Sequence, residues 1–69
     1  MSKYEVIIYW HEEDRVFVAE MPELKGCMAH GDTPEEALKE VINVSEEWVK
    51  MAREKGWEIP APKGRLVYA

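Results

Sequence analysis

Apolar and polar residues alternate with a period of two along three short stretches of the chain, at residues 4–10, 15–21 and 27–30. This is the period of a β-strand, whose successive side chains point to opposite faces of a sheet. The polar run 11–14 lies between the first two stretches and is typical of a hairpin turn. Pro22 ends the second stretch because proline cannot donate to a strand ladder. Three consecutive strands with short connections predict an antiparallel meander.

The two faces of the first predicted strand differ in character. One face is wholly apolar and is expected to lie against the core. The other face is mixed, and because it carries Ile7 and Tyr9 we expect it to be partly covered. The apolar face consists of Tyr4, Val6, Ile8 and Trp10, and the mixed face consists of Glu5, Ile7, Tyr9 and His11.

Residues 34–55 have the period of an amphipathic α-helix. Thr33 stands at the N-cap with Glu36 placed to complete a capping box, Pro34 occupies the first helical position, and Gly56 follows the last turn. Apolar residues fill about half of the helix circumference, more than the stripe of about 100° that a surface helix needs. We expect the excess margin to mediate self-association, the alternative being that a twisted sheet covers it. That margin consists of Val44, Trp48 and Met51.

The remainder of the chain predicts one further strand. Residues 57–64 contain two prolines, which favour an extended connection, and residues 65–68 then form a short strand. A strand that follows such a helix returns by a right-handed crossover. The chain, residues 1–69, is therefore predicted to be a single α+β domain, a β-β-β-α-β layer with one helix packed on one sheet face. The opposite face is left without an element of this chain to cover it.

Composition narrows the classes of partner. The formal net charge of -5 and the isoelectric point near 4.9 disfavour nucleic-acid binding and favour a basic partner or simply solubility. A chain of 69 residues buries a small core, and its one cysteine cannot form an internal disulfide, so association with another chain is the remaining common means of stabilisation. No signal peptide or membrane-length apolar run occurs, which predicts a cytoplasmic protein without membrane contact.

The sequence gives only weak indications of catalytic groups. The run 11–14 offers a histidine and three carboxylates, but adjacent residues of a tight turn point in different directions, so a solvated hairpin is favoured over a metal or acid–base site. Cys27 and His30 lie three apart on a strand and hence on opposite faces, so they cannot act as nucleophile and base. We therefore predict no enzyme, no catalytic residue, no metal and no cofactor.

Three segments together resemble a known family. Residues 17–27 read Phe-Val-Ala-Glu-Met-Pro-Glu-Leu-Lys-Gly-Cys, residues 31–38 read Gly-Asp-Thr-Pro-Glu-Glu-Ala-Leu, and residues 56–62 read Gly-Trp-Glu-Ile-Pro-Ala-Pro. This ordered set resembles the HicB antitoxin family over nearly the whole chain. The resemblance implies a partial RNase H-like fold and a homo-oligomer. It also implies a non-enzymatic role, in which the protein binds a small basic HicA-type mRNA-cleaving toxin and covers its active-site histidine.

Many HicB proteins continue into a C-terminal DNA-binding domain, whereas this sequence stops at Ala69. The resemblance therefore implies a stand-alone form of the N-terminal domain, with no direct nucleic-acid contact expected.

Two hypotheses for function follow, and a residual nuclease is a weaker third. The first is an antitoxin module that uses the uncovered sheet face and its rim. The second is a stand-alone homo-oligomeric binding or regulatory domain with no toxin partner, whose uncovered face is occupied by self-association. Under the first hypothesis the partner-binding residues are Glu5, Ile7, Tyr9, Glu12, Glu13, Met28 and His30.

Overall fold

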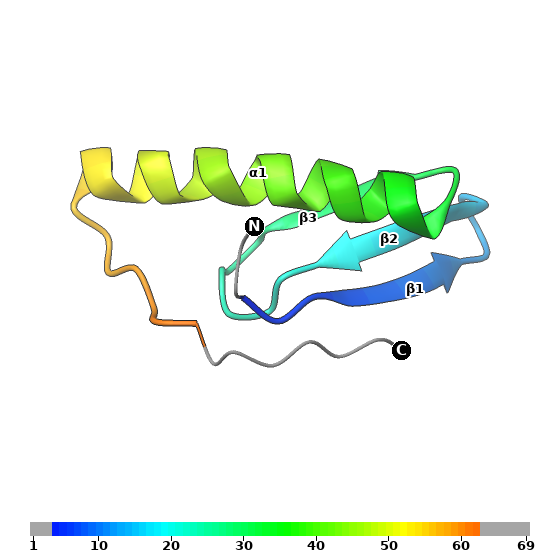
Figure 1. Cartoon of the computed structure of the whole chain (residues 1–69), viewed down its shortest axis with the longest axis horizontal. Coiled ribbons are helices and arrows are strands. Elements are labelled where there is room, and N and C mark those ends of the chain that lie inside the picture. Colours follow the sequence, from blue (N-terminus) through cyan, green and yellow to red (C-terminus); the bar gives the residue numbers. More distant parts are fainter. Residues whose placement is uncertain (1–3, 63–69) are drawn as a thin grey trace.

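A computed structural model describes residues 4–62 of the chain. It contains three strands, β1 (Ile7–His11), β2 (Val16–Glu20) and β3 (Met28–Gly31), followed by one helix, α1 (Pro34–Lys55). The strands pair in chain order as an antiparallel meander, and α1 packs along one face of the sheet (Figure 1). The predicted α+β class is confirmed. The predicted last strand, residues 65–68, lies outside the described residues.

β1 begins three residues later than the alternation predicts. The preceding residues find their hydrogen-bond partners outside the strand ladder. The Tyr4 hydroxyl donates to the carbonyl of Pro60 at 2.6 Å, and the Glu5 N–H donates to the Glu23 carboxylate at 2.8 Å. Because a side chain satisfies the backbone N–H of Glu5, this segment is held without sheet pairing.

The register of the meander sets which residues stand side by side on each face. Ala19 of β2 pairs with Ile8 of β1 and with Ala29 of β3, and this row faces α1. The neighbouring row faces the other way, because side chains alternate along each strand. In that row Val18 stands between Tyr9 and His30.

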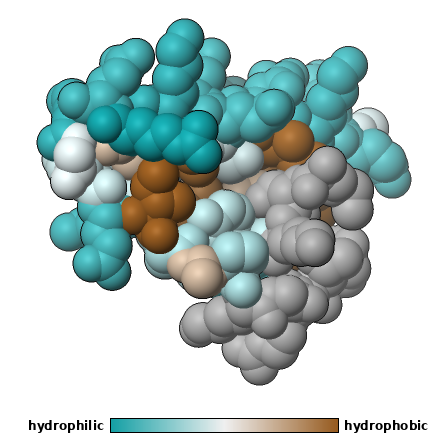
Figure 2. Space-filling view, turned by 60° about the vertical axis from the view of Figure 1, so that its left-hand side comes forward, coloured by the Kyte–Doolittle hydropathy of each residue, from teal (hydrophilic) through white to brown (hydrophobic). Residues whose placement is uncertain are grey.

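The core lies between the helix-facing side of the sheet and one row of α1. Along that row Ala37, Val41 and Ser45 follow at intervals of four residues, and all three are buried. The buried Ser45 hydroxyl donates to the carbonyl of Ile42 at 2.6 Å, so its polar group is satisfied. The outer surface of α1 is polar, with apolar atoms visible beneath it (Figure 2). The buried apolar cluster consists of Val6, Ala19, Met21, Leu24, Cys27, Ala37 and Val41.

Both predicted helix ends are confirmed. The Thr33 hydroxyl accepts a hydrogen bond from the Glu36 N–H at 3.1 Å. At the other end Gly56 adopts the left-handed conformation with φ 72°, and the N–H groups of Gly56 and Trp57 donate to the carbonyls of Arg53 and Ala52. This pair of bonds is a Schellman motif, which satisfies carbonyls that the helix itself leaves unpaired.

The loop between β2 and β3 is part of the core. Leu24, at its centre, is fully buried, and its N–H donates to the Met21 carbonyl at 3.0 Å. The indole N–H of Trp48 on α1 donates to the carbonyl of Lys25 in the same loop at 2.9 Å. The loop is therefore bound to the sheet and to the helix.

Trp10 is more exposed than its place on the apolar face predicts. Its side chain is 46% exposed and contacts Phe17 edge-to-face, with ring centroids 5.0 Å apart. The reason is the position of α1, which packs mainly over β3 and β2 and least over β1. β1 therefore lies at the margin of the contact between α1 and the sheet.

Candidate functional site

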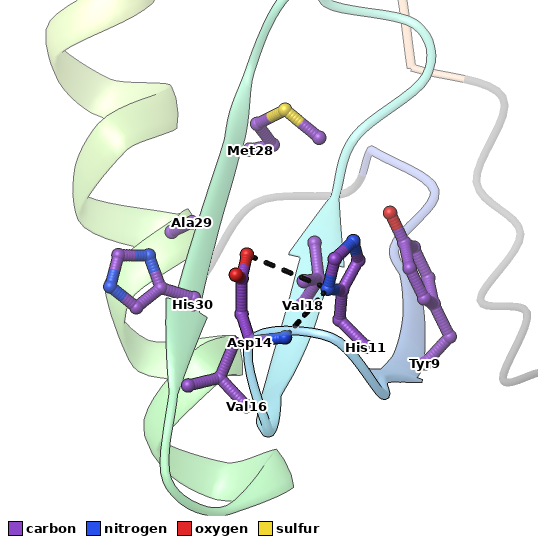
Figure 3. Close-up of a pocket in the computed structure, with 8 residues that line it drawn as sticks. All are labelled: Tyr9, His11, Asp14, Val16, Val18, Met28, Ala29 and His30. Atoms are coloured by element: carbon purple, nitrogen blue, oxygen red, sulfur yellow. Dashed lines mark hydrogen bonds and ion pairs between the residues drawn. The ribbon is translucent and has the colours of Figure 1, made fainter.

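The face of the sheet opposite α1 is the principal candidate for binding. No element within residues 4–62 covers it. It carries an open hollow of about 400 Å³, and the close-up shows its side chains on the sheet with α1 behind (Figure 3). We call this the open face. The hollow is lined by Tyr9, His11, Asp14, Val16, Val18, Met28, Ala29 and His30.

The centre of the open face is apolar and its rim is polar. Val18 lies in the middle strand between Tyr9 and His30, and Val16 pairs with His11 in the next row. Met28 at the edge strand is 49% exposed, which is high for a large apolar side chain. An apolar centre within a polar rim is the arrangement found in protein–protein contact surfaces.

One histidine of the rim has two competing contacts in the hairpin. His11 Nδ1 accepts a hydrogen bond from the Asp14 N–H at 3.3 Å and lies 3.5 Å from the Asp14 carboxylate (Figure 3). A nitrogen that accepts a hydrogen bond must be unprotonated, whereas an ion pair with the carboxylate requires the protonated ring. Each contact joins His11 to Asp14 of the same turn, so either one holds the imidazole at the rim of the hollow.

The structure places the predicted partner-binding residues in two groups. Tyr9, Met28 and His30 line the hollow, and Ile7 lies on the same face in the adjacent row, where it pairs with Glu20. The three predicted glutamates do not line it. The Glu5 backbone is bonded to Glu23, the Glu12 carboxylate accepts from the Trp10 indole N–H, and Glu13 is exposed in the hairpin. Partner contact at each of these positions stays a prediction.

Sequence reasoning did not select the centre of this face. Val16 and Val18 were expected on the second strand without a binding role, yet they form the floor of the hollow. The available signal was the hairpin length. His11 pairs with Val16 across residues 12–15, and this pairing carries Val18 opposite Tyr9.

The margin predicted for self-association is half-buried. Val44 and Trp48 pack against the core cluster of this chain, and Met51 is also partly exposed. The Trp48 ring lies beside Trp57 with centroids 6.2 Å apart, and the Lys55 ammonium lies 5.1 Å from the Trp57 centroid. The chain's own sheet, loop and C-terminal connection thus contact part of this margin, and its use by a second copy stays a prediction.

The structure keeps Cys27 and His30 apart. Cys27, directly before β3, is 2% exposed and belongs to the core cluster, and burial raises the pKa of its thiol, which is the opposite of activation. His30 is exposed on the other face, as the spacing predicts. Within residues 4–62 no group of three His, Cys, Asp or Glu side chains is placed to hold a metal ion. The search of the same residues found no helix that is long and apolar enough to cross a membrane.

Comparison with known proteins assigns the chain to a family. The profile of the UPF0150-like family matches residues 2–60. The chain belongs to the UPF0150 family. It is similar to the UPF0150 protein ssl0259 of Synechocystis sp., with 40% identity over 63 residues that cover 91% of this chain and 85% of that protein. No solved structure gave a significant match. UPF0150 is a HicB-like family, in agreement with the resemblance of the three motif segments. The RNase H-like relationship stays a prediction.

Proposed function

We propose that this UPF0150 protein is a HicB-like antitoxin module that acts by binding. Its target is a small basic HicA-type mRNA-cleaving toxin, and the open face of the sheet covers the toxin's active site. Such occlusion needs no catalytic residue on this chain. The protein inhibits because the substrate RNA and the antitoxin cannot occupy the same surface.

The observation that carries the proposal is the open face. A half-buried apolar floor of Val16 and Val18 lies beside the two histidines of the open face, and no element within residues 4–62 covers it. An isolated sheet with one face covered normally places polar residues on the other face. Apolar residues at the centre of that face are typical of a surface that a partner covers.

Charge supports a basic partner. The chain carries 14 acidic and 9 basic side chains; of the acidic ones, Asp14 lines the hollow and Glu20 lies in the adjacent row of the open face. Complementary charge raises the rate of encounter between two proteins, and the effect falls with ionic strength. Association with the toxin should therefore slow as salt is added.

The proposal is tested by co-expression with any small basic protein that is encoded beside this gene. We expect the neighbour to arrest growth alone and the wild-type chain to restore growth and co-purify with it. Val18→Lys, at the centre of the open face, should abolish both effects, whereas the control Asn43→Lys, an exposed helix residue with the same charge change, should keep them. If the wild-type chain neither rescues growth nor forms a complex, the proposal is wrong.

A second candidate function is that of a stand-alone homo-oligomeric domain. The observation that favours it is the same apolar floor of Val16 and Val18, because a second copy of this chain would bury it as a toxin would. Sedimentation equilibrium distinguishes the two candidates. A tight oligomer that Val18→Lys dissociates would mean that copies of this chain occupy the open face, which leaves no room for a toxin there.

A further inference from the structure

The outer edge of β3 has unpaired backbone groups that can be identified from the register. The Met21 N–H donates to the Cys27 carbonyl at 3.0 Å, and this single bond marks Met21 and Cys27 as a hydrogen-bonding position just beyond the end of the β2–β3 ladder. Hydrogen-bonded and non-hydrogen-bonded pairs alternate in antiparallel sheets. Ala29 and Gly31 therefore bond to β2, and the N–H and C=O groups of Met28 and His30 point away from it. Within residues 4–62 no strand pairs with this edge.

A groove of about 500 Å³ runs beside this edge, between β3 and the flank of α1. Its β3 wall includes Met28 and His30, and its α1 wall consists of Glu36, Glu40 and Val44. Both glutamates are exposed and neither forms an ion pair within the described residues. An extended chain placed along the edge would thus have the backbone of β3 on one side and two carboxylates on another.

The spacing of these groups matches that of a strand. Glu36, Glu40 and Val44 follow one another at four-residue intervals, which corresponds to about 6 Å along a helix axis. Alternate residues of a β-strand are separated by about 6.7 Å. The helix begins where β3 ends and runs back along it (Figure 1). A strand antiparallel to β3 would therefore present its residues i, i+2 and i+4 to Glu36, Glu40 and Val44 in that order.

We propose that the outer edge of β3 receives an extended segment of a basic partner as a fourth strand. The segment carries Lys or Arg at two alternate positions, facing Glu36 and Glu40, and an apolar residue at the next alternate position, facing Val44. Its intervening side chains extend the open face beside Met28 and His30. The inference deepens the proposed function by describing the sequence that the toxin would present, and it rests on that function for the partner being basic.

Charge disfavours a second copy of this chain as the occupant. Since α1 runs back along β3 (Figure 1), two copies joined antiparallel through β3 would lay their two acidic helix flanks, each with Asp32, Glu36 and Glu40, along one junction in opposite directions. Like charges placed together in this way repel, whereas a basic segment neutralises them. Recognition through main-chain hydrogen bonds and alternating side chains is an established mode of peptide binding.

The probe is the capped peptide Thr-Lys-Val-Lys-Val-Val-Thr, and the readout is nuclear magnetic resonance of the full-length protein. We expect saturating peptide to slow exchange of the Met28 and His30 amide hydrogens. The Ala29 and Gly31 amides, already bonded to β2, should change little. The control peptide Thr-Lys-Lys-Val-Val-Val-Thr has the same composition but places its two lysines on opposite sides of a strand, so it should bind more weakly.

Two double variants test the charge pairs. Glu36→Gln with Glu40→Gln should weaken peptide binding about three- to tenfold, as expected for two exposed ion pairs. Glu47→Gln with Glu54→Gln makes the same change of net charge at exposed helix positions outside the groove and should leave binding unchanged. Thermal unfolding of each variant confirms that it is folded.

The possible outcomes separate this inference from the proposed function. If the toxin binds and growth is rescued while the Met28 and His30 amides remain unprotected in the complex, the edge inference is overturned and the antitoxin role stands. If the peptide protects these amides but no toxin is bound, the edge inference holds without the antitoxin role. Protection of the same amides in the free protein that rises with its concentration would show self-pairing and overturn the inference.

Discussion

Gly31 lies where β3 meets the first turn of α1, and the structure predicts that alanine cannot replace it without cost. A Cβ atom built on Gly31 would lie 2.6 Å from the Ala37 nitrogen and 2.9 Å from both the Glu36 carbonyl carbon and the Glu36 Cβ. The shortest of these distances is 0.8 Å below the 3.4 Å at which ordinary contact begins. Two of the three atoms belong to the helix backbone, so no side-chain rotation relieves the clash.

The expected cost follows from this geometry. Gly31 is not in the left-handed region, so backbone conformation does not oppose alanine and the effect is steric. Overpacking of a close contact costs about 1–3 kcal/mol, and we expect the upper half of that range because backbone must move. A domain of this size has a total stability of about 3–10 kcal/mol. Gly31→Ala should therefore lower the unfolding temperature by about 10–20 °C.

The assay is thermal and urea unfolding followed by circular dichroism, with Gly26→Ala as the matched control. Gly26 has φ 79° with nothing within 4 Å of an added Cβ, so its replacement tests left-handed strain without a clash. We expect Gly26→Ala to lower the free energy of unfolding by about 1–2 kcal/mol. The steric reasoning is refuted if Gly31→Ala is as stable as the wild type, because α1 could not then lie as close to β3 as described.

Three further predictions concern stability. Leu24→Ala should cost about 2–5 kcal/mol in urea unfolding, because Leu24 is fully buried, while exposed Lys25→Ala should change little. Arg15→Gly should raise the free energy of unfolding by about 0.5–1 kcal/mol, because Arg15 has φ 51° in the hairpin and glycine adopts a positive φ without steric cost. An unchanged or lower urea midpoint would contradict this. Burial raises the pKa of Cys27, so folding favours its neutral thiol. The stability that the protein gains by keeping this thiol neutral is fully present below the ordinary thiol pKa of about 8.5, and it is lost as the pH rises through the raised pKa of the folded state. Between pH 7 and 10 the urea midpoint of the wild type should therefore fall more steeply than that of Cys27→Ala. If the two midpoints fall in parallel with pH, the prediction for Cys27 is wrong.

Local signals in the sequence were sufficient for the helix and its ends. Thr33, Pro34 and Gly56 act on backbone groups within one turn, so the predicted bounds of α1 agree with the structure. The three strands were also predicted in order, although their ends differ by up to three residues. At Tyr4 and Glu5 the difference arises because Pro60 and Glu23, which are distant in sequence, provide the hydrogen-bond acceptors.

Tertiary structure decided which of the predicted residues line the candidate site and brought Val16 and Val18 to its centre. Alternation assigns Tyr9, Val18 and His30 to faces, but only the register makes them neighbours, and the register depends on the four-residue hairpin and on Arg15 adopting a positive φ. Gly31 lies at the end of the groove beside β3, where its missing side chain lets the helix backbone approach the strand. A sequence encodes the conformation of each turn through contacts within a few residues, whereas a binding surface is assembled from side chains brought together by packing between segments.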